Sequence, residues 1–286
     1  MRDEFRTKGT HLREVAQGCL EKMFSQLDNP VNYSLVVGDE RVELNPLLGK
    51  SLQIKFSGKI VCNHCGRSTK KSFSQGFCFP CFKKLARCDS CIMSPEKCHF
   101  FAGTCREPEW GETHCMVPHV VYLANSSGVK VGITRKTQIP TRWIDQGATQ
   151  ALPIMEVTTR RMSGLVEEVF RQSVTDRTNW RAMLKGDPEP LDMIAERDRL
   201  LAELESSLEG LRRAEGADSM EILTSADVVD IAFPVMQYPQ KVVSLNPEKE
   251  PEVSGTLLGI KGQYLILDTG CINVRKFTSY EVSVAA

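Results

Sequence analysis

Two pairs of cysteines have the spacing of a metal site. Each pair is separated by two residues, and twelve residues lie between the pairs: Cys62, Cys65, Cys78 and Cys81. Thiolate pairs at this spacing let two tight turns present four sulfurs tetrahedrally to one Zn²⁺. A glycine follows the first pair and another precedes the second, as such turns require. The spacing therefore predicts a structural zinc site.

A second group of cysteines follows directly. We choose four ligands at intervals of two, six and six residues: Cys88, Cys91, Cys98 and Cys105. They would close a second tetrahedral site, which predicts two structural zinc ions in all. Three neighbours remain alternative ligands: His99, His114 and Cys115. An iron–sulfur cluster remains an alternative to zinc here, because ligation by cysteine alone does not exclude it.

The segment around the first cysteines is basic, although the whole chain is neutral. Residues 50–100 carry 10 Lys and Arg against 2 Asp and Glu, whereas the chain holds 36 of each kind. Four lysines are our candidates for contacts with nucleic-acid phosphates: Lys70, Lys71, Lys83 and Lys84. Phenylalanines interleave them, and exposed aromatic rings can stack on bases. The segment therefore predicts a nucleic-acid partner, either DNA or RNA.

A hairpin is predicted after the cysteines. Two apolar runs, 120–124 and 129–133, flank a turn of Asn, Ser, Ser and Gly. Within this stretch, Val120-Val121-Tyr122 and Lys130-Val131-Gly132 are followed by Arg142 and by Glu167 in a helical stretch. The order resembles that of the GIY-YIG nuclease superfamily, in its Lys-x-Gly branch.

The resemblance implies phosphodiester hydrolysis with catalytic residues Tyr122, Lys130, Arg142 and Glu167. In that chemistry a carboxylate holds one Mg²⁺ or Mn²⁺, an arginine stabilises the charge of the transition state, and a tyrosine positions water. Glu168 remains an alternative carboxylate, because adjacent helical positions point about 100° apart and only one can face the site.

Longer strings resemble a bacterial family, the domain of unknown function 2797. They include QGFCFPCF, CDSCIMSPEKCH and HVVYLANSSGVKVGITR, and they extend over roughly residues 60–185. The family implies no particular activity.

The strands and helices expected from the sequence indicate an α+β protein. Both ends are β-rich, and we expect them either to pack together or to cap the centre. A long helix is expected over 191–214, where leucines recur at three- and four-residue spacing. That stripe predicts a packing helix, with a homodimer through it as the alternative. The expected regions are a β-rich N-terminal region 1–61, a zinc-binding segment 62–116, a GIY-YIG-like α/β domain 117–186, a helical region 187–230 and a C-terminal β region 231–286.

No stretch reaches the 18 or so apolar residues of a membrane span, and MRDEFRTKG at the N-terminus lacks the apolar run of a signal peptide. We therefore expect a cytoplasmic protein without a membrane partner. Its function is expected to be that of a zinc-containing nucleic-acid-binding protein with a GIY-YIG-like nuclease core, active or degenerate. The alternative is a non-enzymatic scaffold that binds proteins, because the net charge is zero and the long helix is acidic.

Overall fold

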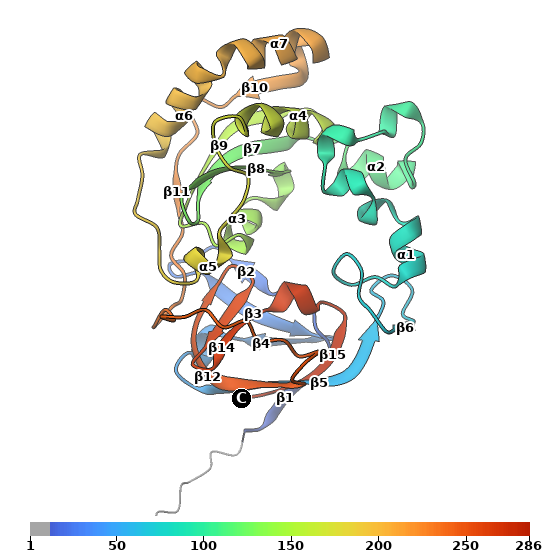
Figure 1. Ribbon diagram of the computed structural model, residues 1–286, viewed down its shortest axis with the longest axis vertical. Coiled ribbons are helices and arrows are strands. Elements are labelled where there is room, and N and C mark those ends of the chain that lie inside the picture. The colour runs from blue at the N-terminus through green and yellow to red at the C-terminus, as the bar shows by residue number, and fades with distance from the viewer. Residues whose placement is uncertain (1–11) are drawn as a thin grey trace, which may run out of the picture.

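The computed structural model describes residues 12–286, and the N-terminal MRDEFRTKG lies outside the described residues (Figure 1). The mixture of helices and strands confirms the α+β class. Within the described residues, none of the helices combines the length and the apolar composition that crossing a bilayer requires.

The two β-rich ends of the chain pair with each other in one sheet. Its main strands run in the order β1-β15-β5-β12-β13-β14, and β5 also pairs with β6. Their bounds are β1 (Glu14–Cys19), β5 (Ser51–Val61), β6 (Ser68–Thr69), β12 (Glu252–Lys261), β13 (Tyr264–Leu267), β14 (Gly270–Asn273) and β15 (Tyr280–Ala285). β5 lies between two C-terminal strands, antiparallel to both, so residues 200 positions apart in sequence share one core.

A smaller sheet packs beside it. Its strands run in the order β2-β3-β4: β2 (Phe24–Gln26), β3 (Asn32–Val37) and β4 (Glu40–Glu43). The turn at Gly38 and Asp39 joins the last two strands, and Gly38 has a φ of 59°, which glycine tolerates best. The short 3₁₀ helix η1 (Asn45–Leu47) then leads into β5.

The central sheet holds the predicted hairpin. Its order is β10-β9-β7-β8, and β11 also pairs with β9, all antiparallel. The strands are β7 (His119–Asn125), β8 (Val129–Arg135), β9 (Gln150–Val157), β10 (Met220–Ile222) and β11 (Val229–Asp230). The helices around it are η6 (Lys136–Gln138), α3 (Thr141–Asp145), α4 (Arg160–Phe170), α5 (Trp180–Met183), α6 (Met193–Glu203), α7 (Glu205–Glu215) and η7 (Ala217–Ser219).

Strand β7 is buried on both faces, which explains its nearly continuous apolar sequence. Val121 and Leu123 belong to one core with residues of α4, α6 and α7. Tyr122 and Ala124, which point the opposite way, belong to the core shared with the terminal sheets. Figure 1 accordingly shows the central sheet between the helices and the terminal strands. Both faces of the central sheet are therefore packed against other elements.

The predicted helix over 191–214 is divided in two. Asp192 caps the start of α6 by accepting a hydrogen bond from the Ala195 amide, and the helix ends at Leu204. The break lets α6 pack on β9 while α7 lies along α4. Leu204 and Leu208 are about 5% exposed, in a core of their own chain. A single straight helix could not follow both surfaces, and the homodimer stays a prediction.

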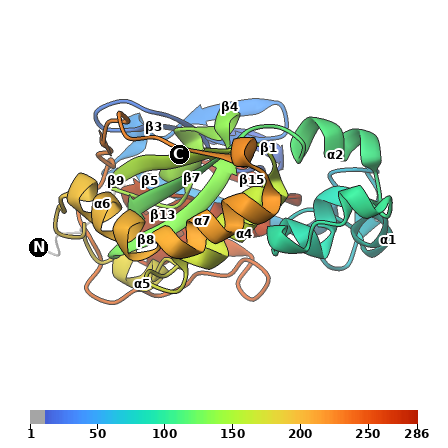
Figure 2. The ribbon, with the colours of Figure 1, turned by 90° about the horizontal axis from the view of Figure 1, so that it is seen from above.

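The cysteine-rich segment stands at one side of the sheets (Figure 2). It consists of short helices joined by turns: α1 (Phe79–Lys84), η2 (Ala86–Cys88), η3 (Ser90–Ile92), η4 (Pro95–Lys97), η5 (Phe100–Ala102) and α2 (Pro108–His114). Its η4 turn packs closely on α4. A Cβ atom added at Gly164 would lie 2.5 Å from the backbone nitrogen of Glu96, so only glycine permits this approach. The last 3₁₀ helix, η8 (Val274–Phe277), precedes β15.

Candidate functional site

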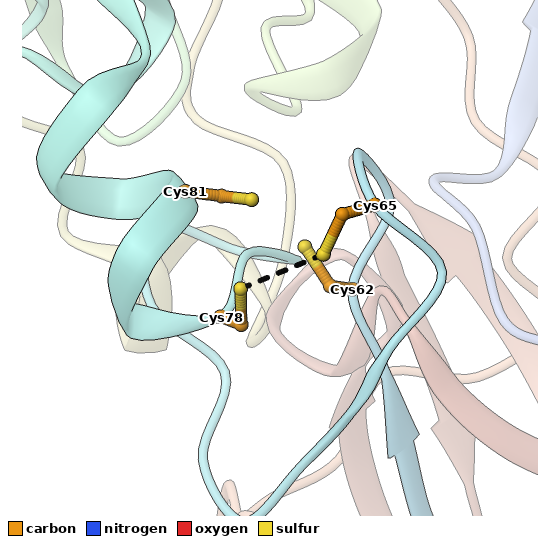
Figure 3. Close-up of side chains that lie close together, drawn as sticks. All are labelled: Cys62, Cys65, Cys78 and Cys81. Carbon is orange, nitrogen blue, oxygen red and sulfur yellow. Dashed lines mark hydrogen bonds between the residues drawn. The ribbon is translucent and has the colours of Figure 1, made fainter.

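The first four cysteines converge as the spacing predicts (Figure 3). The sulfurs of Cys62, Cys65, Cys78 and Cys81 all lie within 4.8 Å of one another. The Sγ atoms of Cys65 and Cys78 are 3.7 Å apart. A tetrahedral Zn²⁺ with Zn–S bonds of about 2.3 Å requires sulfurs about 3.8 Å apart. This group therefore has the ligand type and the dimensions of one zinc site.

The electrostatics of the group favour a bound cation. Burial opposes the charge on Cys62, but backbone N–H groups directed at its sulfur lower the pKa of this thiol to about 6. Burial and the neighbouring thiols raise the pKa of Cys81 to about 12. Four thiolates cannot share this space without a positive charge among them, and a divalent metal would supply it.

Three of the four cysteines predicted as ligands of the second site line one small cavity. Cys91, Cys98 and Cys105 line a small cavity together with Cys115, whereas Cys88 does not. Cys88 instead packs in the apolar cluster of the first group, beside Leu85. The physical reason is that η2 follows α1 after one residue, so Cys88 stays on the side of the first group.

The two histidines near this cavity have other partners. Nδ1 of His99 is 2.8 Å from Oγ1 of Thr104, and Nε2 of His99 is 3.4 Å from the carboxylate of Asp89. Asp89, Cys91 and His99 nevertheless place one ligand atom each within 4.8 Å of the others. His114 stacks on Trp110, with ring centroids 4.3 Å apart.

The four candidate phosphate-binding lysines lie on the surface of the first cysteine group. Lys70, Lys71, Lys83 and Lys84 are all exposed, and none of them forms an ion pair with a carboxylate of residues 12–286. Among them, Phe79 is 53% exposed, and Nζ of Lys83 lies 5.9 Å from the centre of its ring. This surface therefore combines positive charge without carboxylate partners in the described residues and an exposed aromatic ring.

Two of the predicted catalytic residues, Tyr122 and Lys130, share one hydrogen-bond partner, Gln146. The hydroxyl of Tyr122 on β7 donates to Oε1 of Gln146 at 2.9 Å, and Nζ of Lys130 on β8 donates to the same atom at 2.7 Å. Arg142 on α3 and Glu167 on α4 lie close enough to influence the charge of both. We call Tyr122, Lys130, Arg142, Gln146 and Glu167 the central polar cluster.

The glycine of the Lys-x-Gly element has a steric role in this cluster. Gly132 is the cross-strand partner of Tyr122. A Cβ atom at Gly132 would lie 2.6 Å from the Tyr122 hydroxyl oxygen. The tyrosine can therefore lie across β8 and reach Gln146 only because residue 132 has no side chain.

Burial shifts the pKa values of the cluster. Burial, followed by the charge of nearby Asp176, raises the pKa of Glu167 to about 7, although Arg171 and Arg142 oppose the shift. Burial also lowers the pKa of Lys130 to about 8, with the charge of Arg142 acting in the same direction. A carboxylate and an amine that both titrate near neutral pH are typical of sites that bind charged ligands or transfer protons.

Glu167 and Glu168 have different surroundings. Glu167 is half-buried and faces the cluster, whereas Glu168 is exposed and forms an ion pair with Arg171. Within the described residues, no ion pair is formed by Glu167 or by Arg142, which leaves both charges available to a ligand. Adjacent helical residues cannot share a face, so α4 presents Glu167 alone.

Two further residues belong to this region although sequence reasoning missed them. Gln146 follows α3 by one residue and connects Tyr122 with Lys130. Burial lowers the pKa of Arg275 on η8, and the charge of nearby Arg142 acts in the same direction. Its Nε donates to Oε1 of Gln75 at 2.9 Å. No spacing rule could have found Arg275, because 133 positions separate it from Arg142.

Comparisons with known proteins place the chain in a family without naming an activity. No curated protein and no solved structure matches it, so the GIY-YIG resemblance rests on the residues themselves. Residues 49–282 match the sequence model of the family described as "Protein of unknown function (DUF2797)". That match spans the cysteine groups, the central sheet and most of the terminal sheet. The chain therefore belongs to the DUF2797 family.

Proposed function

We propose that this protein binds nucleic acid through its zinc segment and hydrolyses phosphodiester bonds at the central polar cluster, as a GIY-YIG-like nuclease does. The observation that carries the proposal is the meeting of Tyr122, Lys130, Arg142 and Glu167. These residues come from four different elements, β7, β8, α3 and α4, and nothing in a purely structural core requires two cations and a carboxylate to meet without neutralising partners.

Each side chain has a distinct role in this proposal. Glu167 would hold a divalent cation, which polarises the phosphate and lowers the pKa of an attacking water. Arg142 stabilises the charge that develops on the phosphate oxygens, because a guanidinium donates two parallel hydrogen bonds to such a group. Tyr122 and Lys130 form the buried floor of the cluster, and both are held in place by their hydrogen bonds to Gln146.

The surroundings of the cluster support a polyanionic substrate. Arg275 adds a third cation near Arg142 and bonds to Gln75, which belongs to the loop between the first two cysteine pairs. Of the four exposed lysines, Lys70 and Lys71 lie in the same loop, and Lys83 and Lys84 lie on α1 directly after it. A nucleic acid that contacts this segment would therefore reach positive charge at both the zinc site and the central polar cluster.

The cysteine-rich segment packs against the helix that carries Glu167. Its η4 turn packs against Gly164 of α4, three residues before Glu167. Metal binding that orders this segment would thus fix the helix that carries the carboxylate. We accordingly assign the cysteine groups a structural role and the central polar cluster the chemical one.

The experiment compares Glu167→Gln with Glu168→Gln in the full chain. Single-stranded and duplex DNA and RNA substrates are incubated with each protein and Mg²⁺ or Mn²⁺. We expect Glu167→Gln to abolish cleavage while zinc content and circular dichroism stay unchanged, and Glu168→Gln to retain it. Absence of metal-dependent cleavage in the wild-type protein on every substrate, or equal rates in the two variants, would overturn the nuclease assignment. Salt-sensitive binding of nucleic acid without cleavage would indicate a domain that binds nucleic acid but does not hydrolyse it.

A further inference from the structure

Two half-buried arginines, Arg142 on α3 and Arg275 on η8, have no carboxylate partner among residues 12–286. The ion pairs in that part of the chain are formed by other arginines. Burial lowers the pKa of Arg275, and the nearby charge of Arg142 acts in the same direction. Two partly buried cations without a counter-charge repel each other, and an anion bound between them would neutralise both.

Hydrogen bonds connect the two elements that carry these arginines. Nε2 of Gln263, in the turn between β12 and β13, donates to Oδ1 of Asp145 on α3 at 2.9 Å. The carbonyl of the same glutamine accepts a hydrogen bond from the amide of Val274, directly before Arg275, at 2.9 Å. Arg142 lies three residues before Asp145, on the same side of the helix. Gln263 therefore joins η8 to the face of α3 that carries Arg142.

The carboxylate of Asp145 attracts Arg275, but both of its oxygens already have partners. Its Oδ2 atom lies 2.7 Å from Nζ of Lys22, and its Oδ1 atom accepts the hydrogen bond from Gln263. Lys22 therefore compensates the charge of Asp145. The positive charge of the two arginines stays without a counter-charge of its own.

The guanidinium of Arg275 is oriented by one hydrogen bond. Its Nε atom donates to Oε1 of Gln75 at 2.9 Å. Within the described residues, neither Nη atom of Arg275 forms a hydrogen bond, and neither does the guanidinium of Arg142. The nitrogens of a guanidinium donate in parallel to two oxygens of one phosphate. Gln75 thus fixes Arg275 while its terminal nitrogens stay available to such a group.

The backbone that presents Gln75 is held by the first cysteine group. Phe73 and Phe77 exchange backbone hydrogen bonds of 2.8 and 2.9 Å, which close a tight hairpin with Gln75 at its tip. Gln75 has a φ of 61°, which is uncommon for a residue other than glycine. The amide of Asn63, in the first cysteine turn, donates to the carbonyl of Gly76 at 2.8 Å. The two cysteine turns therefore determine the position from which Gln75 reaches Arg275.

We propose that Arg142 and Arg275 bind one internal phosphodiester group of a nucleic-acid chain between them, with Gln75 as the residue that positions Arg275. The exposed Lys70 and Lys71 precede Gln75 in the same loop. A chain with several phosphates can contact both these lysines and the two arginines, whereas a single phosphate cannot. This inference rests on the nucleic-acid binding of the proposed function but not on its hydrolysis step.

The test measures binding of the full chain to an internally labelled single-stranded DNA without terminal phosphates, and to RNA of the same sequence, without added Mg²⁺ or Mn²⁺. We expect Arg275→Gln to weaken binding about ten- to hundredfold and to reduce the salt slope by about 0.7. The matched control Lys276→Gln removes an exposed cation from the same helix and should bind like the wild-type protein. Equal affinities of the two variants, or a wild-type protein that binds neither strand, would overturn the proposal. Binding that depends on Arg275 in a protein that cleaves nothing would contradict the hydrolysis step alone.

Two further variants separate the phosphate contact from a folding defect. Gln75→Ala should weaken binding about two- to tenfold with unchanged zinc content, and it should cause no further loss in the Arg275→Gln background, because its effect passes through Arg275. Additive losses would contradict the positioning role of Gln75. Arg275→Lys keeps the charge and should therefore keep the salt slope of the wild-type protein, although it binds more weakly. Loss of the slope in Arg275→Lys as well would show that residue 275 acts on the fold and does not contact phosphate.

Discussion

The first cysteine group and the central polar cluster bring reactive side chains together by different routes. The cysteine group is built from two turns within residues 62–81, so each ligand is close to the others along the chain. The central polar cluster draws Tyr122 and Lys130 from a hairpin, and Arg142 and Glu167 from helices on either side of β9. The first geometry depends on local backbone conformation, whereas the second depends on how a sheet and its helices pack. A substitution in the cysteine group should therefore disturb only the neighbouring turns, whereas a substitution in the central polar cluster should affect the packing of several elements.

The largest effect is expected from removing a zinc ligand. Cys62→Ser should lose one zinc per chain and unfold the segment around it, because structural zinc contributes on the order of 10 kcal/mol to the folding of such small segments. Elemental analysis and limited proteolysis measure the two losses. Cys19→Ser is the control, since Cys19 is isolated and half-exposed. Equal zinc content in the two variants would contradict a local zinc site.

The next largest effect concerns catalysis at the cluster. Arg142→Ala should lower the cleavage rate by about 10²- to 10³-fold, as loss of a transition-state charge contact commonly does. Lys130→Met should also lose rate if the amine supports chemistry, and should lose only affinity if it serves binding. The control is Arg199→Ala, which removes a surface arginine paired with Glu196 and Glu203. If Arg142→Ala cleaves at the wild-type rate, Arg142 of the central polar cluster takes no part in the reaction.

A smaller effect is expected in the pH dependence of stability. The pKa of Glu167 rises from 4.5 to about 7 on folding, so the folded state binds the proton more tightly. The free energy of unfolding should therefore fall as pH rises from 4.5 to 7, and it should level off above that range. Since the side chain is partly solvated, we expect a change of about 1 to 2 kcal/mol.

Urea unfolding at several pH values, without divalent metal, measures this change. Glu167→Gln should lack this component of the pH dependence, while Glu168→Gln should keep it. If both variants follow the wild-type curve, the carboxyl group of Glu167 is not buried as the cluster requires.

The smallest effect is expected from the exposed lysines. Lys83→Glu should weaken nucleic-acid binding by up to about tenfold at 0.1 M salt and reduce the salt slope by about one, in all sequences alike. Fluorescence anisotropy at several salt concentrations measures both. Lys249→Glu is the matched control, because Lys249 is exposed between two glutamates. Identical losses in the two variants would indicate a general charge effect rather than an interface at the zinc segment.

The cysteine spacing and the hairpin were predictable because both are local. Two residues between thiols and a turn with glycine leave few backbone conformations, and two apolar runs that flank a turn ending in Gly128 identify the strands β7 and β8. The mixed helix and strand content confirms the expected α+β class. The position of β5 between β12 and β15 shows that the two β-rich ends pair, which is one of the two arrangements expected. These features were predictable because they depend on neighbouring residues or on the burial of one apolar face of a strand.

Other features depend on tertiary contacts that the spacing of residues along the chain does not reveal. The leucine stripe predicts one helix over 191–214. The helix is instead interrupted at Leu204, because α6 and α7 pack on different surfaces. The even intervals of the second cysteine group favoured Cys88, yet the turn after α1 keeps that side chain in the first group. Gln146 offered no chemical signal, although it holds two members of the central polar cluster.

Local sequence signals were enough to predict the ligand type of the first cysteine group, the hairpin of the central sheet and the candidate catalytic residues on and near it. Side-chain type and short-range backbone geometry suffice for these. The tertiary structure was needed to show that Glu167 rather than Glu168 faces the cluster, that Cys115 lines the same cavity as Cys91, Cys98 and Cys105, and that Arg275 lies near Arg142. These positions follow from the packing of elements far apart in the chain, where burial of apolar surface selects one arrangement among many that the local pattern permits.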